Sequence, residues 1–428
     1  MDQPRITELP SGVRVVTESM DSVRSVTLGF WIGTGSSVED EPHAGLSHLI
    51  EHMLFRGTAK YASLQIDQTF DAMGAELNAG TGKETTSVYA RVLDVHLPEA
   101  LDVIADMVWR PKFSEDDLRN EREIVLEEIA MYEDDPQDKV FDVLGEAVFA
   151  GHPLGRAIIG HADVVAGTPA EGLRAFHAER YVPRNVVVAA AGSVDHDRLV
   201  EMVERAQVER VGAPLPSLVA PPAPTPAVVR FLTKETEQTH VCLGGAGIAR
   251  DDERRFALRV LDTLLGGTSS SRLFQEVREQ RGLAYSVYSF QSLFAQTGQV
   301  GLYLGTRPDN VAAALRVVGD ELERVRTEAV PADELERAKE NVKGRMVLAL
   351  ESTAARMNRL GASVLADLPL LSLDEVLAKV DAVSADEVLE LAASLYAPEK
   401  LSAAGIGGDE AAFRAALEPV SPALAAAA

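Results

Sequence analysis

Residues 45–55 read Gly-Leu-Ser-His-Leu-Ile-Glu-His-Met-Leu-Phe. Their apolar residues recur at helical spacing and the run stops before Gly57, so we expect a helix here. On a helix, positions i and i+4 lie one turn apart on the same face, which brings His48 and His52 together. Two imidazoles placed in this way can bind one Zn²⁺ at about 2.0–2.1 Å. Glu51 shares their face, where its carboxylate can take a proton from a water that the metal activates.

The same pattern would also arise from two histidines that pack on a core helix and bind no metal. Only nine histidines occur in the 428 residues, which makes a chance match of this kind uncommon. A catalytic zinc site has three protein ligands and one open position, so the rest of the chain must supply a third ligand.

Residues 114–133 are rich in carboxylates. Ser114 followed by Asp117 is typical of a capping box, which predicts that a helix starts here. One face of this helix carries the i, i+4 and i+7 residues Glu121, Val125 and Glu128. A different face carries Arg119, Glu123 and Glu127, which we expect to form a solvent-exposed ladder of i,i+4 pairs. Periodicity separates Glu121 and Glu128 from this ladder, but it does not show that they touch a metal.

These motifs together resemble the insulinase (pitrilysin) family of inverted-zincin metallopeptidases, whose signature is His-x-x-Glu-His. The chain is similar to the short-chain bacterial members, which are related to mitochondrial processing peptidase. The resemblance implies that His48, His52 and Glu128 hold one Zn²⁺ per chain and that Glu51 is the general base. It also implies that Glu121 lies behind a ligand histidine and orients it.

Two further stretches carry the resemblance. The segment Asn78-Ala79-Gly80 is similar to the segment that leads to the family's substrate-binding edge strand, and it is implied to bind substrate. Arg278 and Tyr285, seven residues apart, resemble the family's Arg…Leu-x-Tyr element. The resemblance implies that these two side chains bind the substrate carbonyl, where their N–H and O–H groups can stabilise an oxyanion. The alternatives are a surface ion pair of Arg278 with Glu276 or Glu279, and an ordinary strand position for Tyr285.

The chain also repeats itself with a period of about half its length, which is typical of two similar domains rather than of a solenoid. Residues 55–58 resemble residues 265–268, and residues 116–119 resemble residues 333–336. The second copy lacks the candidate ligands. It carries Leu258-Arg-Val-Leu-Asp262 at the place of the histidine motif, and Ala338 and Arg345 at the places of Glu121 and Glu128.

The sequence therefore predicts an α+β protein with two similar tandem domains, each with a mainly antiparallel sheet covered by helices. We expect a zinc-bearing domain at 1–212, a Pro-rich linker at 213–228, and a second domain at 229–428 that has no metal site and supplies substrate contacts. Runs such as 25–31 and 185–191 are predicted strands.

The net charge of −25 argues against nucleic acids and anionic membranes as partners. The single cysteine, Cys242, excludes an intrachain disulfide. No 18-residue apolar run and no signal pattern occur, so we expect a cytoplasmic protein.

The resemblance implies a zinc endopeptidase that hydrolyses extended peptides or unfolded segments. The alternative is a non-catalytic structural or assembly subunit, as some relatives are. Long-chain relatives close four such domains around the substrate, and the Arg…Tyr element lies in the last one. We therefore expect a homodimer in which Arg278 and Tyr285 complete the site of the other chain.

Overall fold

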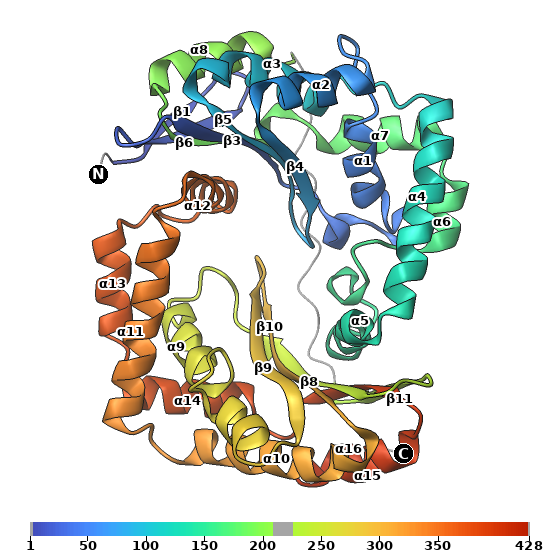
Figure 1. Ribbon diagram of the computed structural model, residues 1–428, viewed down its shortest axis with the longest axis vertical. Coiled ribbons are helices and arrows are strands. Elements are labelled where there is room, and N and C mark those ends of the chain that lie inside the picture. The colour runs from blue at the N-terminus through green and yellow to red at the C-terminus, as the bar shows by residue number, and fades with distance from the viewer. Residues whose placement is uncertain (1–2, 209–225, 427–428) are drawn as a thin grey trace. The chain divides into compact units, whose positions relative to one another are not determined.

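The computed structural model describes residues 3–208 and 226–426 (Figure 1). The described chain forms two compact units that exchange segments between the two halves of the sequence. The first unit comprises residues 3–130, 157–208 and 347–372, and the second comprises 131–156, 226–346 and 373–426. Most of the predicted linker at 213–228 falls outside the described residues.

The sheet of the first unit has six strands in the order β1-β2-β6-β3-β5-β4. Their bounds are β1 (Arg5–Glu8), β2 (Arg14–Ser19), β3 (Ser25–Ile32), β4 (Glu76–Thr81), β5 (Thr86–Leu93) and β6 (Val186–Gly192). Only the β2–β6 pair is parallel, and all other neighbours are antiparallel. Among the residues that the structure describes, strand β4 therefore ends the sheet on one side and has one free edge.

The sheet of the second unit has five strands in the order β7-β11-β8-β10-β9. Their bounds are β7 (Val229–Thr233), β8 (Thr239–Gly247), β9 (Ala284–Leu293), β10 (Gly298–Thr306) and β11 (Ser402–Gly407). Apart from β1, the five strands of the first sheet have the same topology as the five strands of the second. The one parallel pair of the second sheet, β7–β11, corresponds to the parallel pair β2–β6 of the first. The predicted fold, two similar domains with mainly antiparallel sheets, is confirmed.

Helices of the first unit come from both halves of the sequence (Figure 1). They are α1 (Leu46–Leu54), α2 (Ser63–Met73), α3 (Leu97–Trp109), most of α4 (Glu115–Asp134), α6 (Ala162–Gly167), α7 (Ala170–Arg180), α8 (His196–Ala206) and α12 (Thr353–Leu365). Those of the second unit are α5 (Pro136–Val148), α9 (Arg255–Leu265), α10 (Val311–Thr327), most of α11 (Ala332–Ala349), α13 (Leu373–Asp381), α14 (Ala385–Leu395), α15 (Glu410–Ala416) and α16 (Pro422–Ala426).

Strand β6 is buried along its whole length because helices cover both faces of its sheet. Side chains alternate between the faces of a strand, so Val186, Val188 and Ala190 join the main core beneath α3. The intervening Val187, Ala189 and Ala191 join a second core cluster with α12. Burial on both sides explains why this strand reads as an unbroken apolar run.

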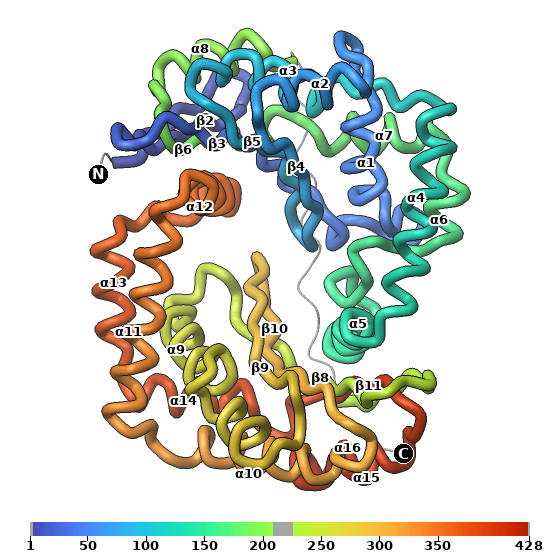
Figure 2. The backbone as a smooth tube through the Cα atoms, in the orientation of Figure 1, coloured from blue at the N-terminus to red at the C-terminus, as the bar shows by residue number. Residues whose placement is uncertain are grey.

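Helix α12 belongs to the second half of the sequence but packs on β2, β3 and β6 of the first unit (Figure 2). Trp31 Nε1 donates to Met357 Sδ at 3.2 Å, and the hydroxyls of Thr27 and Thr353 lie 2.8 Å apart. Gly361 permits the close approach, because a Cβ there would lie 2.2 Å from Trp31 Nε1.

Helix α5 makes the reciprocal arrangement in the second unit. It belongs to the first half of the sequence and packs on β7, β8 and β11. Its Val140 and Leu144 join Cys242 and Tyr303 in a buried cluster. Each sheet thus has one face covered by a helix that the other half of the sequence encodes. None of the helices in the described residues is long and apolar enough to cross a membrane.

We expect Gly361→Ala to lower the stability of the first unit, because the added methyl group collides with the Trp31 ring. Overpacking of this kind typically costs about 1–3 kcal/mol. Gly344→Ala is the matched control, since it adds the same methyl group to α11 where no atom lies within 4 Å. There the smaller entropy of the unfolded chain should stabilise the protein by roughly 0.4–1 kcal/mol. Thermal and urea midpoints measure both effects, and equal midpoints for the two variants would contradict the packing of α12.

Candidate metal centre

Helix α1 brings His48 and His52 together, with ring centroids 4.7 Å apart. The helix begins after Gly45, whose φ of 101° places it in the left-handed region. The buried carboxylate of Glu39 accepts the backbone N–H groups of Gly45 at 2.8 Å and Ser47 at 2.7 Å. These N–H groups have no partner within the helix, so Glu39 anchors the start of α1. No standard capping spacing in the sequence marks this residue.

Helix α4 carries the carboxylates, and Ser114 caps it as predicted by accepting the Asp117 N–H at 3.2 Å. Glu121 is only 1% exposed and Glu128 is half-buried, whereas Glu123 and Glu127 are exposed. The predicted ladder is wrong in one respect. Arg119 pairs with Asp116 at 3.0 Å, because that carboxylate lies within reach one turn earlier on the exposed face.

Three side chains converge where α1 faces α4. Glu128 Oε2 lies 3.7 Å from His48 Nε2 and 3.5 Å from His52 Nε2. All three ligand atoms lie within 4.8 Å of one another, and no other such group of His, Cys, Asp or Glu occurs in residues 3–208 and 226–426. Tetrahedral zinc with ligands at about 2.0–2.1 Å needs ligand atoms roughly 3.3 Å apart. The group therefore fits zinc with only small side-chain movements.

Glu121 supports this group from behind. Its Oε2 lies 3.2 Å from His52 Nδ1, and its Oε1 lies 2.5 Å from Arg56 Nε. A carboxylate can only accept, so the proton of the neutral His52 ring sits on Nδ1 and the lone pair of Nε2 faces Glu128. The sequence did not single out Arg56, although it directly follows the histidine helix.

The two imidazoles differ electrostatically. Burial, and then the neighbouring His52, lower the pKa of His48 to about 4, so this ring is neutral at pH 7 and can act as a ligand. The pKa of His52 is raised, mainly by its hydrogen bond to Glu121 and then by the nearby carboxylate charges. Three carboxylates around two histidines favour a bound cation.

Glu51 lies on the same helix face but is not one of the three converging ligands. Thr81 Oγ1 donates to Glu51 Oε2 at 2.6 Å. Burial raises the pKa of Glu51, and the hydroxyl and backbone N–H of Thr81 partly oppose this shift. A carboxylate with a raised pKa is a stronger proton acceptor, which suits a general base. Thr81 directly follows the predicted substrate segment, but nothing in the sequence indicated its contact with Glu51.

Asn78, Ala79 and Gly80 lie on β4, the edge strand that contacts α1. Leu77 and Ala79 pack toward the core, whereas Asn78 and Gly80 point to the exposed face. Asn78 Oδ1 accepts the Ala79 N–H at 2.9 Å. The free edge of β4 thus lies next to the helix that carries the candidate ligands.

Arg278 and Tyr285 lie in the second unit and contact each other. Arg278 is part of a π-helical turn, Phe274–Glu279, and Tyr285 is the second residue of β9. The Arg278 guanidinium lies 4.6 Å from the centre of the Phe274 ring and 4.7 Å from that of Tyr285. Arg278 Nε also lies 3.5 Å from Glu279 Oε1. Tyr285 is 76% exposed, so its hydroxyl is free of the core.

The equivalent helices of the second unit carry no such ligand group. Asp262 on α9 stands at the place of His52, and burial raises the pKa of its carboxyl group. Ser289 Oγ donates to Asp262 Oδ1 at 2.6 Å. Ala338 and Arg345 on α11 take the places of Glu121 and Glu128.

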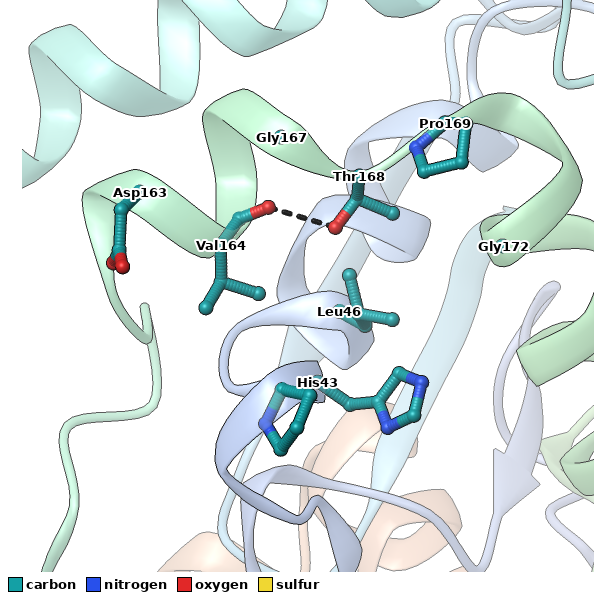
Figure 3. Close-up of a pocket in the computed structure, with 9 residues that line it drawn as sticks. His43, Leu46, Asp163, Val164, Gly167, Thr168, Pro169 and Gly172 are labelled. Carbon is teal, nitrogen blue, oxygen red and sulfur yellow. Dashed lines mark hydrogen bonds between the residues drawn. The ribbon is translucent and has the colours of Figure 1, made fainter.

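A hollow of about 260 Å³ opens near the start of α1, but none of the three converging residues lines it (Figure 3). His43 and Leu46 face Val164 and Thr168 across it, and the Thr168 hydroxyl donates to the Val164 carbonyl at 2.7 Å. The hollow is therefore separate from the candidate metal centre.

Comparisons with known proteins agree with this geometry. The insulinase (peptidase family M16) model matches residues 14–162, which include His48, His52 and Glu128. The peptidase M16 inactive domain model matches residues 169–342, which include α9 and its Asp262. A crystal structure of a peptidase M16 inactive domain from Pseudomonas fluorescens is 25% identical, with a TM-score of 0.89, and the match covers 95% of this chain and 98% of that chain.

Two relatives are named uncharacterized zinc proteases. The one from Streptomyces coelicolor is 47% identical over 384 residues, which cover 88% of this chain and 83% of the relative. The one from Bacillus subtilis is 40% identical over 388 residues, which cover 90% of this chain and 94% of the relative. The sequence resemblance is confirmed, and the chain belongs to the insulinase family of peptidases, peptidase family M16.

Proposed function

We propose that the protein is a zinc-dependent endopeptidase that hydrolyses extended peptides or unfolded segments of proteins. The observation that carries this proposal is the convergence of His48, His52 and Glu128 beside Glu51. The relatives named zinc proteases support it. We propose one Zn²⁺ per chain, held by those three residues.

The roles of the side chains follow from their chemistry. A zinc ion in this position would polarise the scissile carbonyl and make water more acidic. Glu51 accepts the proton of the attacking water and later passes it to the leaving amine. Glu121 holds His52 in the tautomer that presents Nε2, and Arg56 keeps the Glu121 carboxylate in place.

Extended peptides suit the free edge of β4. A peptide that adds as a further strand obtains main-chain hydrogen bonds from Leu77 and Ala79, whatever its sequence, after it displaces the Asn78 side chain from the Ala79 N–H. Folded proteins have few unpaired backbone groups to offer and would be poor substrates. We therefore propose that Asn78, Ala79 and Gly80 contact the substrate backbone.

Arg278 and Tyr285 are proposed to stabilise the oxyanion, since both offer hydrogen-bond donors and lie stacked together. We propose that they serve the metal centre of the partner subunit in a symmetric homodimer, which provides the four domains that long-chain relatives carry in one chain.

The first prediction from this proposed function concerns the metal ligands. Glu128→Gln should sharply reduce zinc content after dialysis, because it removes the only anionic ligand of the group. Glu127→Gln is the matched control, since it removes the same charge from the exposed face of the same helix turn. Metal analysis of the purified proteins measures the difference. Equal zinc content in the two variants would rule out Glu128 as a ligand.

The second prediction concerns the base. Glu51→Gln should retain zinc and lose peptide hydrolysis by at least about 10²–10⁴-fold, the usual contribution of general-base catalysis. The assay follows cleavage of an unstructured fluorogenic peptide, with and without a chelator. A Glu51→Gln protein that cleaves at the wild-type rate would refute the mechanism. A zinc-loaded wild-type protein that cleaves no unstructured peptide would refute the proposed activity.

The third prediction concerns the shared site. We expect an inactive Glu51→Gln chain and an impaired Tyr285→Phe chain to regain activity when they are mixed and exchange subunits. In a shared site, each mixed dimer contains one intact pair, with Glu51 from one chain and Tyr285 from the other. If both elements meet within one chain, every site stays defective. Absence of activity despite confirmed exchange would therefore contradict the homodimeric site.

A further inference from the structure

We propose that Thr81 is a positioning residue for Glu51, and that it links the peptide-binding edge of the sheet to the general base. This inference rests on the proposed function, because it assigns a role within the same site. It adds a residue from β4 to a centre otherwise built from α1 and α4.

Thr81 contacts the Glu51 carboxylate through two groups. Its hydroxyl donates to Oε2 at 2.6 Å, and its backbone N–H also favours the charged form of the carboxylate. The terminal torsion of a glutamate side chain is broad, so a carboxylate without partners would rotate freely on the helix surface. The hydroxyl bond and the neighbouring N–H group of Thr81 restrict that rotation. They occupy lone pairs of Glu51 on the side of β4 and leave others for a water molecule.

The position of Thr81 in β4 gives these contacts a second consequence. Gly82 N–H donates to the Thr85 carbonyl at 2.7 Å, which closes the hairpin to β5. In an antiparallel pair, residues alternate between those that bond the partner strand and those whose backbone groups point away from it. Counting back from Gly82, the backbone groups of Thr81, Ala79 and Leu77 point to the free edge.

The Glu51 carboxylate, bonded to the Thr81 hydroxyl, thus lies beside the last N–H group of this free edge. A peptide that adds to β4 can bond to Leu77 and, once it displaces the exposed Asn78 side chain from the Ala79 N–H, to Ala79, but it meets the Glu51 carboxylate at Thr81. Thr81 is therefore the position at which the added strand ends. It also holds the Glu51 carboxylate, which removes a proton from water at this position. This arrangement places a backbone amide of the peptide beside the base in a defined register.

The hairpin that carries Thr81 is itself held in place. Ser36 N–H donates to the Gly82 carbonyl at 3.2 Å, and Ser37 N–H donates to the Lys83 carbonyl at 2.7 Å. Gly35 permits this approach, since a Cβ there would lie 2.3 Å from the Gly82 oxygen. Glu39, a few residues later, anchors the start of α1. One short segment therefore positions both the hairpin and the helix that Thr81 and Glu51 connect.

The test compares Thr81→Val, which removes the hydroxyl at nearly constant volume, with Thr81→Ser, which keeps it. In the zinc-loaded full-length protein acting on an unstructured fluorogenic peptide, we expect Thr81→Val to lower kcat roughly 10–100-fold, as for loss of a hydrogen bond to a charged group. KM should change by less than about twofold, because the peptide still finds the free edge. Thr81→Ser should restore most of kcat, and all variants should keep their zinc.

Thr69→Val is the matched control, because the Thr69 hydroxyl on α2 bonds only its own helix at Gln65. It should behave as wild type. Thr81→Ala, which adds no volume, replaces Thr81→Val if the latter fails to fold. A wild-type kcat in the hydroxyl-free variant, an effect on KM alone, or an equal loss in Thr81→Ser would each overturn the proposal.

A crystal structure of Thr81→Val separates this inference from the proposed function. We expect the Glu51 carboxylate to leave the position that it occupies beside β4. If the wild-type protein cleaves no peptide, the proposed function fails, whereas the positioning of Glu51 is still judged by that structure. An unmoved carboxylate in the variant would overturn the role of Thr81 even in an active enzyme.

Discussion

The ion pairs of the Glu121 carboxylate are the interaction on which the metal centre depends. This carboxylate is almost fully buried, and a buried charge without partners would cost several kcal/mol, on the order of the whole stability of a domain. Its partners, His52 and Arg56, lie on α1 and directly after it, whereas Glu121 belongs to α4. The ion pairs that compensate the buried charge of Glu121 therefore hold α1 and α4 in contact. That contact places Glu128, two turns later on the same face, against both imidazoles.

Hydrogen bonds to backbone groups add to the side-chain packing that surrounds this contact. Glu39 accepts the free N–H groups at the start of α1, and Ser36 and Ser37 donate to the turn of the β4–β5 hairpin. Such bonds are directional, so they limit rotation as well as distance. Helix, hairpin and the segment between β3 and α1 therefore form one framework, and a catalytic site needs this kind of rigid support to keep its groups in register.

The second unit shows that the fold does not require the metal centre. It repeats the strand order of the first unit, yet Ala338 replaces the buried Glu121, which removes the charge that had to be paired. Asp262 replaces a ligand histidine and is satisfied by a serine hydroxyl. Both sheets are instead completed by exchanged helices, α12 in the first unit and α5 in the second. Burial of the two sheets stabilises the fold of both units, whereas only the first unit carries the candidate metal ligands.

Features that depend on local spacing could be predicted from the amino-acid sequence. Helical periodicity placed His48, Glu51 and His52 on one face and separated Glu121 from the exposed Glu123, and strand patterns located β3 and β6 to within one residue. Contacts between distant segments could be found only in the folded structure. Examples are the pairing of Arg56 with Glu121, the anchoring of α1 by Glu39, the hydrogen bond from Thr81 to Glu51 and the exchange of α5 and α12. Periodicity reports which side of an element is buried but not which element covers it, because that choice depends on how complete surfaces fit together.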